Sequence, residues 1–341
     1  APLDVLQDII GGGETSLLYK NLQKPGIAIQ SSAGHPCGEI SCTFNIFALA
    51  NPQRNLNLNE IEINIRNSLE EFESRGVNED DLIRVKSSIV AGMVYGLESV
   101  SGKVTQLAAY ETYRSDPNGI TGDIKRYESV TKKDVIRVYN EYIKNKPSVI
   151  MSIVPEGQKD KVAGSDTWKR YTRNIPEDMK SEEFNWSPPE DNFDRSVVPS
   201  AGPNPKIKTP TVYTSDINGI PLLGSINSEV PTTTISVRIK SGQSNESLDK
   251  LGLASLTATM MNESTKQLSI ENISNELAKL GASYSWSSGD TYTILNIRSL
   301  SKNADQTIKL AINSLLEPKF DEKDFLRNKN NVIQNLKQSK K

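Results

Sequence analysis

The chain has 341 residues, of which 36% are hydrophobic, enough for two or three domains with apolar cores. Its 40 basic and 42 acidic residues leave a net charge of −2, which gives no electrostatic reason to expect a nucleic acid or an anionic membrane as partner. No apolar run approaches the about 18 residues that a membrane-spanning helix needs, so no membrane span is predicted. The start, Ala1-Pro2-Leu3-Asp4, lacks the features of a secretory signal, so the sequence names no compartment; a periplasmic or other extracytoplasmic location would fit a bacterial parent.

Residues 1–155 mix helices and strands and are expected to form one module. Apolar residues at helical spacing begin at Leu3, until Gly11-Gly12-Gly13 interrupt the helix and a second one starts near Ser16. Apolar patterns predict strands over 27–32, 39–49 and 148–154. Helix ends and starts are predicted at Gly76, at Asn78 with Asp81, and at Thr131 with Asp134.

The single histidine, His35, lies close in the sequence to both cysteines, Cys37 and Cys42. Cys42 falls in an apolar alternation from Ile40 to Ala48 that predicts the buried face of a strand, so we expect a small buried cysteine there. A disulfide between the two cysteines, or a metal site that they form with His35, is the alternative.

Residues 156–208 are expected to be a linker rather than a packed domain. Eight of the chain's 17 prolines fall between Pro155 and Pro210, and prolines remove backbone donors and fix φ. Aromatic side chains are costly to leave in water, so we expect the linker to dock on both neighbouring modules, with a disordered linker as the alternative. These aromatic residues are Trp168, Tyr171, Phe184, Trp186 and Phe193.

Residues 209–341 predict a further module of helices and strands. A hairpin is expected around Asn218-Gly219, and alternation from Ile235 to Ile239 predicts a half-buried strand. Helices near 250–262 and 270–280, strands at 282–286 and 292–298 and a helix ended by Pro318 follow. A last helix is capped by Asp321 and still runs at the end of the chain, so we expect an internal piece of something longer.

Three segments of this module resemble the pitrilysin/insulinase family of zinc peptidases, the inverzincins. They are Gly252-Leu-Ala-Ser-Leu-Thr-Ala-Thr-Met260, Lys279-Leu-Gly-Ala-Ser-Tyr284 and Phe320-Asp-Glu-Lys-Asp324. In that family one helix carries H-x-x-E-H, whose histidines bind zinc and whose glutamate activates water. A carboxylate from a later helix is the third ligand.

This chain has neither histidine nor glutamate at the positions that correspond to that motif. Ser255 and Thr259 stand at the histidine positions, Ala258 stands at the glutamate position, and the later carboxylate would fall near Gln334 or Asn335. The module has no histidine to act as a base, so Ser255 and Thr259 are not interpreted as nucleophiles. The resemblance therefore implies a degenerate copy with no catalytic residue and no metal ligand.

Residues 1–155 resemble the non-catalytic module that follows the catalytic one in the same family. The match rests on Ile9-Ile-Gly-Gly-Gly-Glu-Thr-Ser-Leu-Leu-Tyr19, Gly76-Val-Asn-Glu-Asp80 and Ser129-Val-Thr-Lys-Lys-Asp-Val135. The chain departs from the pattern at Lys24-Pro25-Gly26, where many relatives have arginine just before the glycine, so no role of that arginine is carried over.

The glycine run allows three interpretations. It lacks the G-K-[ST] ending of a phosphate loop and the spacing of a dinucleotide site, which argues against nucleotide binding. A helix break is the simplest interpretation. The third is contact with a peptide substrate, because related proteins place a glycine-rich segment near the substrate chamber; Gly11, Gly12 and Gly13 are then candidate substrate-binding residues.

The resemblance implies an α+β fold: two related modules, each a mostly antiparallel sheet with helices packed on it, joined by a proline-rich linker. It implies a non-catalytic portion of a zinc endopeptidase that helps enclose a peptide substrate between two halves. The zinc would lie in a catalytic module outside this chain, in the same polypeptide or in a partner subunit. The alternative is a scaffold or assembly subunit of a non-catalytic relative. If the upstream module lacks H-x-x-E-H and a downstream carboxylate, the endopeptidase hypothesis fails.

Overall fold

The computed structural model describes residues 1–165, residues 209–339 and scattered positions between them, except for the side chains of residues 334, 335, 338 and 339. Contacts divide the chain into one unit of Ala1–Ala163 with Ser228–Lys341 and a second of Gly164–Asn227. Among the described residues, no helix combines the length and apolar character that crossing a membrane requires. The α+β fold class expected from the sequence is confirmed.

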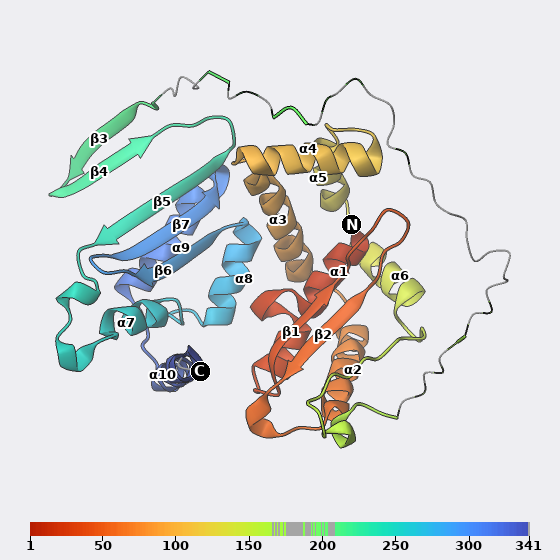
Figure 1. The fold of residues 1–341 in the computed structure, drawn as a ribbon. Helices are drawn as coiled ribbons and strands as arrows, with labels where there is room; N and C mark the ends of the chain where they lie inside the picture. Colours follow the sequence, from red (N-terminus) through yellow and green to blue (C-terminus); the bar gives the residue numbers. More distant parts are fainter. Residues whose placement is uncertain are drawn as a thin grey trace. The chain divides into compact units, whose positions relative to one another are not determined.

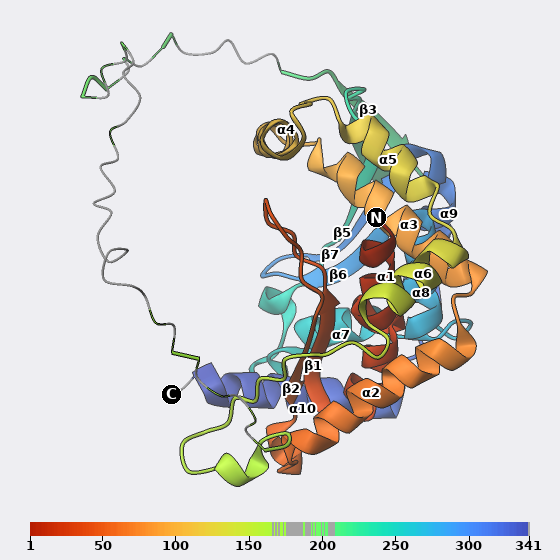
Figure 2. The same ribbon diagram turned by 90° about the vertical axis from the view of Figure 1, so that its right-hand side faces the viewer.

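The first part of the larger unit is a two-stranded antiparallel sheet with helices packed on one side of it (Figures 1 and 2). Its elements are α1 Pro2–Gly11, β1 Ala28–Gly34, β2 Asn45–Ala50, α2 Leu58–Arg75, α3 Glu79–Gly96, α4 Val100–Arg114, α5 Ile120–Glu128 and α6 Lys132–Tyr142. A 3₁₀ turn, Gly13–Thr15, and a π-helical turn, Tyr19–Gln23, lie between α1 and β1. The second helix expected near Ser16 is therefore present but short.

Helix α1 lies at the centre of this part, against β1, α3 and α6. The four apolar side chains Val5, Leu6, Ile9 and Ile10 are fully buried, because their i, i+1, i+4, i+5 spacing puts them on one side of the helix. The core continues into Phe72 of α2, whose ring packs on that of Tyr139 in α6. Burying each apolar side chain of this size contributes about 1.5–3 kcal/mol to the free energy of folding. The four buried side chains of α1 therefore contribute strongly to the stability of this part.

The helix boundaries predicted from local sequence are confirmed. Gly76 ends α2 with φ 66°, a left-handed value that suits glycine. Capping boxes start α3 at Asn78 with Asp81 and α6 at Thr131 with Asp134.

The last part of the larger unit is a three-stranded antiparallel sheet in the order β5-β7-β6 (Figure 1). Its elements are β5 Thr232–Ile239, α7 Leu253–Met261, α8 Ile270–Leu280, β6 Ser283–Ser288, β7 Thr293–Leu300, α9 Ala304–Leu316 and α10 Glu322–Ser339. Trp286 of β6 is buried in its core, and its indole Nε1 donates to Ser314 Oγ of α9 at 2.8 Å.

The two parts of the larger unit meet where α3 packs on α8. Gly281, which ends α8 with φ 58°, leaves room for α3: an added Cβ would lie 2.5 Å from Ala91 Cβ. Tyr95 of α3 donates its hydroxyl to the Gly281 carbonyl at 2.6 Å, and Arg298 of β7 covers the Tyr95 ring at 4.0 Å. Arg298 also pairs with Glu98.

The smaller unit contains the predicted hairpin. Strands β3 Val212–Ile217 and β4 Ile220–Ser225 pair around Asn218 and Gly219, which have φ of 53° and 83°. Positive φ at both positions matches the Asn-Gly turn preferred in two-residue hairpins. Of the five linker aromatics, Tyr171 belongs to the described residues and is exposed, whereas Trp168, Phe184, Trp186 and Phe193 lie outside them.

Two predictions are wrong. Strand β2 begins at Asn45 rather than at 39, and Cys42 is exposed and disulfide-bonded to Cys37, because a turn at Gly38–Ser41 interrupts the apolar alternation. Residues 148–154 form no strand, although Val149, Met151 and Ile153 fit the pattern. A strand needs a neighbour to hydrogen-bond, and the described residues supply none there.

Candidate functional site

Helix α7 carries Ser255, Ala258 and Thr259, the three positions that are expected from the sequence to correspond to the zinc motif. Ala258 is 2% exposed and belongs to the apolar core with Trp286 and Leu295. Ser255 is exposed, and Thr259, one turn later, uses its hydroxyl to donate to the Ser255 carbonyl at 3.0 Å. A zinc ion prefers imidazole, thiolate or carboxylate ligands, so these three residues do not fit one.

The later carboxylate position also lacks an acid. Gln334 and Asn335 lie on the backbone of α10, and their side chains are outside the described residues. The acid nearest to α7 in sequence is Glu263, which is bound to Arg327 at 2.7 Å and to Asn328 at 2.8 Å. Both bonds go to Glu263 Oε1 and hold α10 close to the end of α7.

The start of α7 is fixed by Glu246, which sequence reasoning missed. Its two carboxylate oxygens accept from the backbone N–H groups of Gly252 at 2.7 Å and Ala254 at 2.5 Å. A negative charge is favourable at a helix N-terminus. Because Glu246 lies six and eight residues before its donors, no local capping pattern reveals it.

The three glycines after α1 have three different surroundings. A Cβ on Gly11 would lie 2.1 Å from the backbone nitrogen of Ala33 in β1, and one on Gly12 would lie 2.6 Å from Asp8 Oδ1. Gly13 has φ 68°, is exposed, and would meet no atom within 4 Å. Close packing explains the first two, whereas Gly13 is open backbone that a ligand can approach.

Charged residues gather around the turn that follows these glycines. The turn contacts α8, and burial, then the neighbouring Glu263 and Glu271, raise the pKa of Glu14. Lys24, from the segment that departs from the family pattern, pairs with Glu271 at 2.5 Å. The glycine segment thus lies where the two parts of the larger unit meet.

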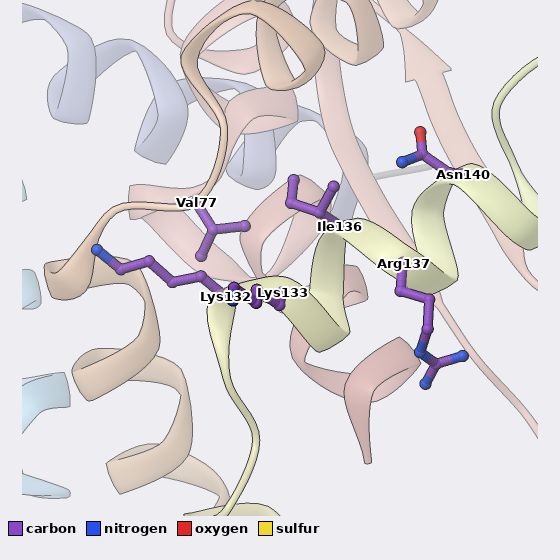
Figure 3. A pocket seen from close by; sticks show the side chains of 6 residues that line it. All are labelled: Val77, Lys132, Lys133, Ile136, Arg137 and Asn140. Atoms are coloured by element: carbon purple, nitrogen blue, oxygen red, sulfur yellow. The ribbon is translucent and has the colours of Figure 1, made fainter.

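A shallow pocket of about 360 Å³ lies beside α6 (Figure 3). Figure 3 shows that the side chains of Lys132 and Arg137 point away from each other. Each has its own partner, Glu79 at 3.2 Å and Glu141 at 3.0 Å. The lining therefore does not form a convergent anion site. The lining residues are Val77, Lys132, Lys133, Ile136, Arg137 and Asn140.

Two family models match the chain, one over its first part and one over its last part. Residues 1–89 match the model "Peptidase M16 inactive domain", and residues 224–341 match "Insulinase (Peptidase family M16)". The chain belongs to the insulinase family of peptidases. The predicted resemblance to this family is thereby confirmed.

Individual relatives of this insulinase-family chain are similar over part of its length. A "Zinc protease PqqE" of Helicobacter pylori is 27% identical over 154 residues, which is 45% of this chain and 34% of the relative. The structure of a "peptidase M16 inactive domain" from Pseudomonas fluorescens is 23% identical and covers 38% of this chain and 32% of its own, with a TM-score of 0.36. A protease structure from Helicobacter pylori is 20% identical and covers 37% and 31%, with a TM-score of 0.34.

The insulinase-family chain therefore spans about a third of the length of the curated relative that it matches. The name of that relative includes zinc, whereas Ser255, Ala258 and Thr259 of α7 carry no imidazole, thiolate or carboxylate.

Proposed function

We propose that this chain is the non-catalytic part of a zinc endopeptidase and that it helps to enclose and position an extended peptide. The observation that carries the proposal is α7, which keeps its cap and its core packing while Ser255, Ala258 and Thr259 offer no zinc ligand. Because these residues supply no zinc ligand, the proposed role of this module is to contact the peptide with its surface. The zinc and the water-activating glutamate would belong to a catalytic module elsewhere in the same polypeptide or in a partner subunit.

Each of the three parts of the sequence has a different proposed role. Residues 1–155 and 209–341 would form two walls of the peptide chamber, and residues 156–208 would connect them. The packing of α3 on α8 through Gly281, Tyr95 and Arg298 supports a fixed relation between residues of the first and last parts. Such a relation is needed if one peptide is to be held by both.

The glycine segment is the proposed point of peptide contact. Gly13 is the position where backbone is exposed and unobstructed, and it lies beside Glu14, at the place where the turn contacts α8. A peptide can approach its backbone more closely there than at a residue with a side chain. Gly11 and Gly12 would act indirectly, by holding the turn against β1 and α1.

The experiment compares Gly13→Asn with Gly157→Asn. Both glycines have positive φ, 68° and 83°, are exposed and have open space around the missing Cβ. Gly157 is the third residue of a turn that is closed by the hydrogen bond from Gln158 N to Pro155 O, a position that also accepts asparagine. Fluorescence anisotropy measures the binding of a labelled unstructured peptide to each variant and to the wild type. We expect Gly13→Asn to weaken binding several-fold and Gly157→Asn to leave it unchanged.

Two results would overturn the proposal. Equal effects of the two variants, or no peptide binding at all, would remove the peptide-positioning role and favour the scaffold alternative. Chelator-sensitive cleavage of the same peptide by the wild-type chain would show that the chain is itself catalytic.

A further inference from the structure

The tip of the β1–β2 hairpin brings both cysteines together on an exposed surface. Cys37 and Cys42 face each other as an antiparallel bridge, and hydrogen bonds from Thr43 N to Pro36 O and from Gly38 N to Ser41 O hold the tip. Both cysteines are exposed and are joined as a disulfide. The hairpin backbone therefore fixes the two sulfurs as neighbours, whether or not they are bonded.

His35 lies directly beside this pair with one ring nitrogen already engaged. Its Nδ1 is 2.6 Å from Asp4 Oδ1, and the other oxygen of Asp4 accepts from the Tyr127 hydroxyl at 2.7 Å. The His35 side chain is 10% exposed. Its second nitrogen, Nε2, is 3.8 Å from Cys37 Sγ. Asp4 of α1 and Tyr127 of α5 thus orient the ring so that Nε2 faces the sulfurs.

This arrangement has the nitrogen and sulfur ligand atoms of a protein zinc site, together with a carboxylate that hydrogen-bonds the histidine ligand. The ligand atoms of His35, Cys37 and Cys42 all lie within 4.8 Å of one another. Around a tetrahedral zinc, with Zn–S near 2.3 Å and Zn–N near 2.0–2.1 Å, the donor atoms are about 3.6–3.8 Å apart. Histidines that bind metals almost always donate their other ring N–H to a carboxylate or carbonyl, as His35 does to Asp4.

We propose that His35, Cys37 and Cys42 form a redox-gated site for zinc, closed while the cysteines are bonded and open when they are reduced. The site is separate from the family's peptidase zinc position and does not depend on the chain's role in peptide binding. Since both sulfurs are exposed, the fourth position of a tetrahedral ion would face solvent and be filled by water or by a ligand from outside the chain.

The gating step is an exchange with a dithiol. The attacking thiolate breaks the Cys37–Cys42 bond through a mixed disulfide, and the second thiol of the reductant completes its own disulfide. Two electrons pass to the protein sulfurs, which become two thiols. Zinc then replaces the two thiol protons, which leave to solvent, so binding weakens as pH falls.

The experiment uses the whole chain in two redox states. One sample is reduced with dithiothreitol and freed of it under nitrogen, the other is kept oxidised, and both are titrated with zinc against a chromophoric chelator. We expect one zinc per reduced chain and no comparable site in the oxidised chain. Cobalt(II) added to the reduced chain should give a thiolate-to-metal charge-transfer band.

Three variants separate this site from a simple pair of thiols. Cys37→Ser with Cys42→Ser should abolish tight binding, while His35→Ala and Asp4→Asn should each weaken it about 10- to 100-fold. Circular dichroism controls for folding, and the oxidised wild type is a control with an identical sequence. Binding by the reduced chain no tighter than by the double serine variant would overturn the proposal. So would unchanged affinity in His35→Ala.

Discussion

Asp8, in the middle of α1, is a partly buried carboxylate that destabilises the fold at neutral pH. Its pKa is raised from 3.8 to about 6, mainly by burial; the attraction of Arg84 opposes the rise and the repulsion of Asp4 adds to it. Arg84 is itself 5% exposed and is shared with Asp81, which lies 3.5 Å from it. Asp8 is therefore incompletely compensated, and we expect Asp8→Asn to stabilise the protein at neutral pH.

The magnitude and sign follow from linkage between protonation and folding. Each pKa unit corresponds to about 1.4 kcal/mol, so a rise from 3.8 to about 6 costs the folded state about 3 kcal/mol once Asp8 is ionised. Because the folded pKa is the higher one, this cost is absent below pH 3.8, grows between the two values and is complete above about pH 6. Asp8→Asn should gain about 1–3 kcal/mol at pH 7.5, less than the full cost because the attraction of Arg84 is lost too, and gain at most about 0.5 kcal/mol at pH 4.

Urea unfolding followed by circular dichroism, at pH 4 and at pH 7.5, measures the difference between variant and wild type. Asp4→Asn, one turn away on α1, is a control of opposite sign: burial acts against ionisation there, but hydrogen bonds with His35 and Tyr127 win and lower the pKa of Asp4. That variant should lose stability at pH 7.5 and lose less at low pH. An equal effect of Asp8→Asn at the two pH values would refute the reasoning.

Three further changes test other parts of the fold. Ser255→His with Ala258→Glu and Thr259→His should give no zinc-dependent peptide cleavage, because a third ligand is missing; activity in a sensitive peptide assay would contradict this. Gly281→Ala should cost at least about 1–2 kcal/mol from its left-handed backbone alone, measured as a lower urea midpoint, and an unchanged midpoint would disprove the close packing of α3 on α8. Glu246→Gln should weaken the α7 cap by about 1 kcal/mol; unchanged hydrogen exchange at Gly252 and Ala254 would argue against it.

Local sequence predicted those features whose causes are local. The capping boxes at Asn78 and Thr131 depend on residues three positions apart, and the hairpin at Asn218-Gly219 depends on two adjacent residues, so short patterns contain the whole cause. The strand over 148–154 was predicted wrongly because its existence depends on a partner strand, which no pattern within the segment reports.

The sequence also left open what His35, Cys37 and Cys42 do together. Their closeness along the chain is visible, but the choice between a buried thiol, a disulfide and a metal site depends on the hairpin turn. It depends as well on Asp4, which is 31 residues away and on another element. Helices α4 and α5 were not predicted, although Val100, Val104 and Leu107 of α4 recur at helical spacing. All three side chains are exposed, so this apolar face is not buried against the described residues.

The three consecutive glycines after α1 differ in the substitutions that they can accept. At Gly11 and Gly12 any side chain collides with Ala33 or Asp8, so a complete set of point variants should contain no folded replacement at either position. Gly13 needs only a left-handed backbone, which asparagine and aspartate can also adopt. Among sequences that share this fold, the first two positions should stay fixed as glycine while the third drifts among glycine, asparagine and aspartate, unless a bound peptide forbids a side chain there.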